Sequence, residues 1–67
     1  MAIAKVVEIS SSSPTSFEDA VTKGISRASK TLEDIRGAWV QDQKVVVDNG
    51  RIKEYRVNLK LTFELNE

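Results

Sequence analysis

The residues of this chain that could hold a flat ligand lie in the stretch "GAWVQDQ", residues 37–43, which carries the single tryptophan, Trp39. Amides follow it at Gln41 and Gln43, so a strand here projects an indole and two amides from one face. Three roles are open for Trp39: a subunit contact, a platform on which a planar ring stacks, or local packing. Because tryptophan is enriched at interfaces, the subunit contact is favoured.

Catalytic chemistry has little support in the composition. The chain has no cysteine and no histidine, which removes disulfides, thiolate sites, the commonest metal ligand and the usual general base. No carboxylate pair, nucleophile–base spacing or glycine-rich phosphate loop stands out, so we predict that the protein is not an enzyme. Acidic residues could still meet at subunit contacts and bind a hard cation, although solvated charges are the commoner role; they are Glu8, Asp42, Asp48 and Glu64.

The length predicts one small domain, residues 1–67, that oligomerises. A chain of 67 residues buries only about 60% of its unfolded surface, so its own core gives marginal stability. With disulfides excluded and histidine ligands absent, oligomerisation is the remaining way to compensate. Ten basic and ten acidic residues balance each other, which argues against a nucleic-acid partner. No apolar run suits a signal peptide or a membrane span, so we expect a cytoplasmic protein without a membrane partner.

The first half of the chain predicts a strand followed by a helix. Residues 3–9 alternate and are rich in β-branched side chains, and residues 10–16, "SSSSPTS", read as a capping loop. Ser16 is a suitable N-cap, and Asp19 three residues later completes a variant capping box for a helix over residues 17–35.

One apolar stripe runs along the predicted helix, with Lys23, Arg27, Lys30 and Glu33 lying off it in solvent. Its members are Phe17, Val21, Gly24, Ile25, Ala28, Leu32 and Ile35. Gly24 costs about 1 kcal/mol against alanine in a helix, so we expect a strand to cross closely there. Gly37 is expected to end the element.

The second half predicts a hairpin. Residues 38–47 form one strand, "DNG" at 48–50 is a turn, and residues 51–65 form a strand with strict alternation. The fold class is therefore α+β, in the order β-α-β-β: a three-stranded antiparallel sheet with one amphipathic helix packed on one face. If the last strand were an edge, it would invite pairing with another subunit.

The sheet face away from the helix is predicted to be polar and aromatic. Ala38 and Val40 are expected to point at the helix, so Trp39, Gln41 and Gln43 point away. The last strand adds four side chains to this second face: Arg56, Asn58, Lys60 and Thr62. Such a face is too polar for a core and too aromatic for ordinary solvated surface.

These features together resemble the dodecins. The resemblance rests on "SSSPTSFEDAV", "RASKTLEDI", a tryptophan in the second strand and "KEYRVNLKLTFEL", and it runs from about Lys5 to Leu65. It implies a hollow homododecamer of cubic-type symmetry that binds a flavin (riboflavin, FMN, FAD or lumichrome) without catalysis. It implies further that some members bind coenzyme A and that one subgroup binds calcium.

The chain departs from the flavin-binding pattern of that family at both contact positions. The family's stacking tryptophan aligns with Gly37, and the family's glutamine on the last strand aligns with Arg56. Arginine only donates, so it lacks the acceptor that the flavin N3–H needs. With Gly37 and Arg56 at these positions, the chain looks more like the less characterised, non-flavin or calcium-associated subgroup.

Trp39 could replace the missing platform from a shifted position. Residues 37 and 39 share a face and lie about 6.6 Å apart along a strand. The predicted ligand-binding residues are therefore Gly37, Trp39, Gln41 and Arg56, for a flavin or a related cofactor at subunit interfaces; a coenzyme A site is less favoured. The alternative is an assembly protein that binds no flavin and holds calcium, or nothing, at its interfaces, with metal ligands that the sequence does not identify.

Overall fold

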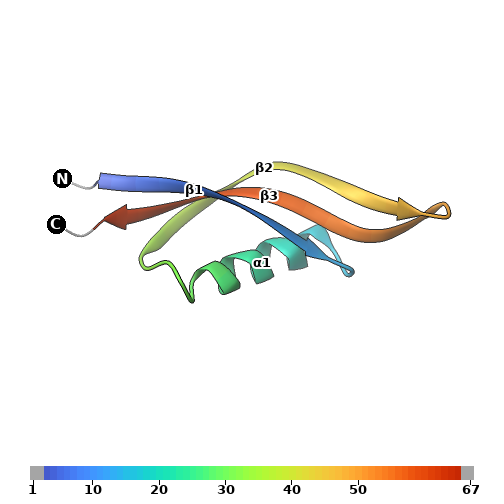
Figure 1. Cartoon of the computed structure of the whole chain (residues 1–67), viewed down its shortest axis with the longest axis horizontal. Helices are drawn as coiled ribbons and strands as arrows, with labels where there is room; N and C mark the ends of the chain where they lie inside the picture. The colour runs from blue at the N-terminus through green and yellow to red at the C-terminus, as the bar shows by residue number, and fades with distance from the viewer. Residues whose placement is uncertain (1–2, 66–67) are drawn as a thin grey trace.

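The chain folds in the predicted order, strand, helix, strand, strand. The structure is a computed structural model that describes residues 3–65. Its elements are β1 (Ile3–Ser13), α1 (Phe17–Ala28), β2 (Ile35–Asp48) and β3 (Arg51–Leu65) (Figure 1).

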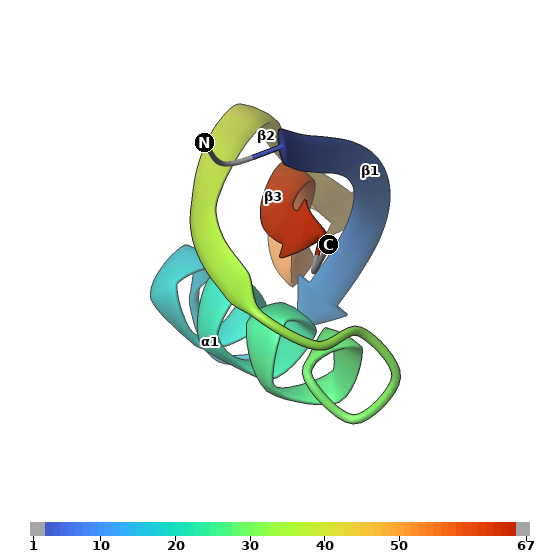
Figure 2. The same cartoon turned by 90° about the vertical axis from the view of Figure 1, so that its left-hand side faces the viewer.

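The three strands form one antiparallel sheet in the order β1-β3-β2. The last strand, β3, is therefore central and β1 and β2 are the edges, so β3 does not offer a free edge to another subunit. Figure 2, a view along the strands, shows β3 between β1 and β2, with α1 on one side of the sheet. Because directly paired residues share a face, the register assigns every paired side chain either to the helix side or to the opposite side, here called the outer face.

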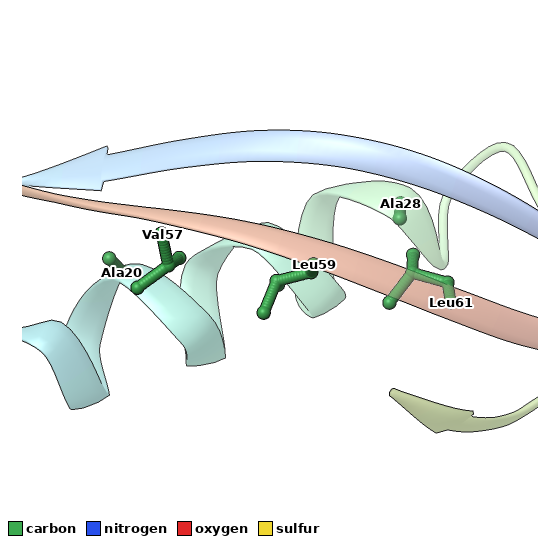
Figure 3. Close-up of a cluster of buried hydrophobic side chains, with 5 residues drawn as sticks. All are labelled: Ala20, Ala28, Val57, Leu59 and Leu61. Atoms are coloured by element: carbon green, nitrogen blue, oxygen red, sulfur yellow. The ribbon is translucent and has the colours of Figure 1, made fainter. Parts of the chain in front are cut away.

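The core forms where α1 packs on β1 and β3. Alternate residues of β3 are buried against alanines of α1, as Figure 3 shows; the five are Val57, Leu59, Leu61, Ala20 and Ala28. The alternation predicted for the last strand is confirmed from Tyr55 to Leu65, but nearer the turn a register shift leaves Lys53 without a direct partner on β2 and breaks it. The core is small, as expected for a chain of this length.

The predicted start of the helix is confirmed. Ser16 has an extended backbone and its Oγ accepts the amide N–H of Asp19 at 2.9 Å, which satisfies one of the free donors of the first turn. The carboxylate of Asp19 has a different role from the one predicted. It accepts from Ser13 Oγ at 2.5 Å and pairs with Lys23 Nζ at 3.1 Å, so it links the end of β1 to α1.

The predicted end of the helix is wrong by about two turns. α1 ends at Ala28, where Ser29 caps it and donates its Oγ–H to the carbonyl of Ile25 at 2.8 Å. Asp34, with φ of 58°, then turns the chain into β2. Gly37 therefore does not end the helix but lies inside β2.

The apolar spacing predicts a helix end that is too late in the chain, because Leu32 and Ile35 pack against the core without being helical. Leu32 belongs to the connection after α1, where its amide N–H bonds the carbonyl of Ala28 at 2.8 Å. Ile35 pairs with Phe63 as the first residue of β2. A tertiary pairing here overrides a local periodicity that fits a helix equally well.

The serine run is mostly strand and not loop. β1 continues to Ser13, and its last four residues pair with β3. Ser11 Oγ donates to the carbonyl of Ala20 at 2.7 Å, and Ser13 is buried. Serines serve here because their hydroxyls satisfy backbone and carboxylate acceptors where β1 approaches α1.

The close approach predicted at Gly24 is confirmed. A Cβ added there would lie 3.0 Å from Ser11 Cβ and 3.4 Å from Leu59 Cδ1. Gly24→Ala is expected to destabilise the protein by about 1–3 kcal/mol, because overpacking outweighs the gain in helix propensity. Urea denaturation measures the change, with Ser26→Ala on the exposed side of α1 as the matched control. A Gly24→Ala protein as stable as the control would contradict the close contact.

The bond network at Asp19 predicts a loss of stability in acid. The hydrogen bond from Ser13, and then Lys23, holds the pKa of the Asp19 carboxyl below its ordinary value. A lowered folded-state pKa contributes stability above the unfolded-state value, and that contribution is lost as the pH falls through the folded-state value. Asp19→Asn is therefore expected to lower the melting temperature at pH 7, and the difference is expected to shrink below about pH 4. Parallel melting curves of the two proteins against pH would contradict this role; Ser13→Ala should show the same pattern.

The turn between β2 and β3 is as predicted. Asn49 and Gly50 are its two central residues and have φ of 53° and 77°. Two positive φ values in a two-residue loop are those of a type I′ hairpin turn, which asparagine–glycine favours.

Candidate ligand-binding face

The outer face consists of polar rows that run across the sheet. Each row takes one residue from β2, one from β3 and one from β1. In order along β3 the rows are Gly37–Thr62–Val6, Trp39–Lys60–Glu8, Asp42–Asn58–Ser10 and Lys44–Arg56–Ser12. The four β3 residues predicted for this face are confirmed.

Trp39 dominates this face because the residue is 63% exposed. The register places it opposite Lys60, with Glu8 on the other side of that lysine. An indole left so exposed in a small domain is available to a planar ligand or to another subunit.

Gly37 lies in the neighbouring row, on the same face as Trp39, as predicted. Its carbonyl accepts from Thr62 Oγ1 at 3.3 Å, and a Cβ added at Gly37 would lie 3.2 Å from that same oxygen. A larger residue at position 37 therefore has to displace the Thr62 hydroxyl. The contact pairs the glycine with this threonine.

A β-bulge at Gln41 changes which amides accompany Trp39. The register shifts between Val40 and Asp42, so Gln41 has no direct partner on β3. Asp42 then joins the outer face, and Gln43 pairs with Val57 on the helix side. The prediction that Gln43 points away from the helix is thus wrong, because one extra residue reverses every later side chain.

A small polar pocket of about 160 Å³ follows the Trp39 row on the outer face. Asn58 Nδ2 donates to Asp42 Oδ1 across the strands at 2.7 Å, and Lys44 and Arg56 also line the pocket. Sequence reasoning did not single out Lys44. Its signal was hidden by the bulge, since plain alternation from Trp39 puts residue 44 on the other face.

Arg56 lies two rows away from Trp39 on the outer face. Arg56 and Lys60 are four positions apart on β3, which corresponds to about 13 Å along a strand. Its Nε donates to Glu54 Oε1 within an ion pair, and Lys44 lies opposite it on β2. The four predicted site residues therefore form no single cluster: Gly37 and Trp39 are neighbours, Gln41 forms the bulge, and Arg56 lies two rows away.

Among residues 3–65, no three acidic side chains gather closely enough to hold a metal ion within one subunit. Asp42 and Glu8 lie on the outer face but in different rows.

No helix in the described part of the chain is long and apolar enough to cross a membrane.

Comparisons with known proteins agree on one family. A model of the dodecin family matches residues 3–66. Calcium dodecin from Mycobacterium tuberculosis is 37% identical over 97% of this chain and 92% of that protein. A dodecin from Streptomyces davaonensis superposes with a TM-score of 0.94 at 30% identity, covering 98% of this chain and 97% of the other.

A crystal structure of the M. tuberculosis calcium dodecin, described as having a novel calcium-binding site, superposes with a TM-score of 0.83 at 36% identity and covers 96% of this chain and 91% of that one. These matches in sequence and in fold agree with the resemblance to the dodecins that the sequence motifs indicate. The chain belongs to the dodecin family.

Proposed function

We propose that this single-domain protein assembles into a hollow homododecamer that binds a small ligand without catalysis, the ligand being a flavin or a related cofactor held on the outer face around Trp39. The observation that carries the proposal is the 63% exposure of Trp39 on a polar sheet face. Membership of the dodecin family supports both the assembly and the flavin.

The layout of the outer face supports a ligand with a ring at one end and an anion at the other. A planar ring stacked on Trp39 gains an aromatic contact of about 0.5–1.5 kcal/mol beyond its buried area. About 13 Å further along β3, Lys44 and Arg56 offer two cationic donors beside the polar pocket. Arginine in particular suits phosphate, which its planar guanidinium binds with two hydrogen bonds. FMN, or a larger phosphorylated cofactor such as FAD, fits this spacing better than riboflavin, and coenzyme A is less favoured because it lacks the flavin ring.

Titration of riboflavin and FMN into the purified assembly tests the proposal. Stacking on Trp39 is expected to quench both flavin and tryptophan fluorescence at micromolar protein, and FMN is expected to bind more tightly than riboflavin. Arg56→Gln is expected to reduce the preference for FMN over riboflavin, because it removes a cation and places at position 56 the glutamine of the family's flavin-binding pattern. If neither riboflavin nor FMN causes fluorescence quenching, the flavin proposal is wrong.

Calcium binding at subunit interfaces is the second candidate. The observation that favours it is the relative named calcium dodecin, at 37% identity over nearly the whole chain. Carboxylates of Asp42 and Glu8 on the outer face could join those of a neighbouring copy, because calcium takes six to eight oxygen ligands. A colourless protein whose melting temperature rises with calcium but not with flavin would select this candidate, with Asp42→Asn as the variant that should lose the rise.

The proposal excludes an enzymatic role, a nucleic-acid partner and a membrane partner, and it places the protein in the cytoplasm. The support is the absence of cysteine and histidine and the even balance of ten basic and ten acidic residues.

A further inference from the structure

Gln41 has a special position on β2, because it is the extra residue of the bulge. The register shifts between Val40 and Asp42, so Gln41 has no residue of its own to pair with on β3. Bulges bend a strand, re-aim a side chain and are common next to binding sites. This bulge lies two residues after Trp39, so it shapes the surface directly beside the exposed indole.

Strand alternation keeps Gln41 on the outer face. Trp39 and Val40 have regular partners on β3, so no register shift lies between Trp39 and the bulge. Residues two apart on a strand share a face, which puts Gln41 about 6.6 Å from Trp39 along β2. Gln41 is exposed and takes part in none of the side-chain hydrogen bonds among residues 3–65. Its amide is thus free to bind a ligand that stacks on the indole.

The polar groups on either side of this amide provide only part of what it provides. Lys60, directly opposite Trp39 on β3, only donates hydrogen bonds. The carboxylate of Asp42, beyond the bulge, only accepts, and it already accepts from Asn58 Nδ2 at 2.7 Å. The side chain of Gln41 has an acceptor and a donor next to each other. This pair matches the edge of a ring on which an N–H adjoins a carbonyl.

We infer that Gln41 determines the specificity of the Trp39 site by binding the edge of the stacked ring. Its amide oxygen accepts from the ring N–H, and its amide nitrogen donates to the adjoining carbonyl. The ligand class that follows is a planar heterocycle with an imide or lactam edge, such as the N3–H and its flanking carbonyls in a flavin. A site that binds such an edge rejects analogues that lack it, because they leave the amide unpaired beneath the ring. The inference rests on the proposed function and deepens it.

A change in the ligand tests the hydrogen bond without altering the protein. In N3-methylriboflavin a methyl group replaces the hydrogen of the ring N3–H, so the donor is lost and the aromatic ring remains. The wild-type assembly is expected to bind riboflavin at least about tenfold more tightly than N3-methylriboflavin, because the amide oxygen loses its partner. Quenching of flavin fluorescence measures both dissociation constants.

Two substitutions at position 41 separate a hydrogen bond from a steric effect. Gln41→Leu keeps a side chain of similar size without polar groups, so we expect it to bind riboflavin about tenfold more weakly and to lose the preference over N3-methylriboflavin. Gln41→Glu keeps an acceptor and is expected to retain the preference. Gln43→Leu is the matched control, because it removes the same amide from the helix side of β2 and should change neither affinity.

The outcomes separate the inference from the proposed function. If neither flavin binds to the wild type, both are wrong. If the wild type binds riboflavin and N3-methylriboflavin equally, the inference is wrong and the flavin site stands, and this result requires no variant. A Gln41→Leu protein that keeps the preference also overturns the inference, because a general distortion of the site weakens both ligands by the same factor.

The control and the folding of the variants complete the test. Equal effects of Gln41→Leu and Gln43→Leu on the preference for riboflavin would overturn the inference, because the amide on the helix side cannot reach a ring on the outer face. Circular dichroism and native mass spectrometry verify that each variant is folded and assembled. If Gln41→Leu does not fold, Gln41→Ala takes its place with the same expected loss of preference.

Discussion

Leu59→Ala is expected to remove a large share of the free energy of unfolding of the protein. Leu59 is 0% exposed, lies at the centre of β3 and forms the middle of the buried cluster. Truncating a buried leucine costs about 2–5 kcal/mol, because the transfer energy is lost and a cavity remains. A domain of 67 residues has a total free energy of unfolding of about 3–10 kcal/mol, so the substitution removes much of it.

Urea denaturation followed by circular dichroism measures this loss. Leu65→Ala is the matched control, because it makes the same chemical change on the same strand at a residue that is 45% exposed. The control is expected to cost under about 1 kcal/mol within the subunit. Measurements at several protein concentrations separate subunit stability from assembly, since association raises the apparent stability by mass action. Equal effects of the two substitutions would show that the core lies elsewhere.

The sequence predicted the class of the fold because its strongest patterns are local and redundant. The period-two alternation of Val57, Leu59 and Leu61 admits one interpretation, a half-buried strand. Ser16 and the asparagine–glycine turn carry their own backbone requirements, so the helix start and the hairpin follow without any tertiary information.

The boundaries failed where a tertiary contact competes with a local pattern. Leu32 and Ile35 continue the helical spacing, yet Ile35 gains a ladder partner in Phe63 by joining β2. The serines at 10–13 have loop-like composition, but β3 is long enough to pair with them, and Ser13 finds an acceptor in Asp19. Neither the helix end nor the length of β1 can be predicted from the neighbouring residues alone.

The site shows the same division. Gly37 and Trp39 share the outer face as alternation requires, and no irregularity lies between them. The bulge at Gln41 has no sequence signal, and it alone removes Gln43 from the outer face and brings in Asp42 and Lys44. The separation of Arg56 from Trp39 depends on the register of two strands, which is set by the hairpin and its bulges together.

Trp39→Ala is expected to lower flavin affinity about tenfold or more, because losing the stacked ring and its buried area removes about 1.4 kcal/mol or more. Flavin fluorescence must be followed here, since the variant has no tryptophan. Trp39→Phe is the control: it keeps an aromatic face and is expected to retain most of the affinity.

The same variant decides between the two main roles of Trp39, because a ligand platform and a subunit anchor respond differently to truncation. If the indole holds the ligand, Trp39→Ala keeps the native mass of the assembly and loses only the flavin. If the indole is an interface anchor, truncation also lowers the mass of the assembly. Truncating an interface tryptophan that is a hot spot costs about 2 kcal/mol or more of binding free energy. The 63% exposure of Trp39 in one subunit is compatible with either role. Lys60, which lies opposite Trp39 on β3, can contact either a ligand or a neighbouring subunit. An assembly that keeps both its mass and its flavin after Trp39→Ala would remove Trp39 from the site altogether and would leave the cations at Lys44 and Arg56 as its centre.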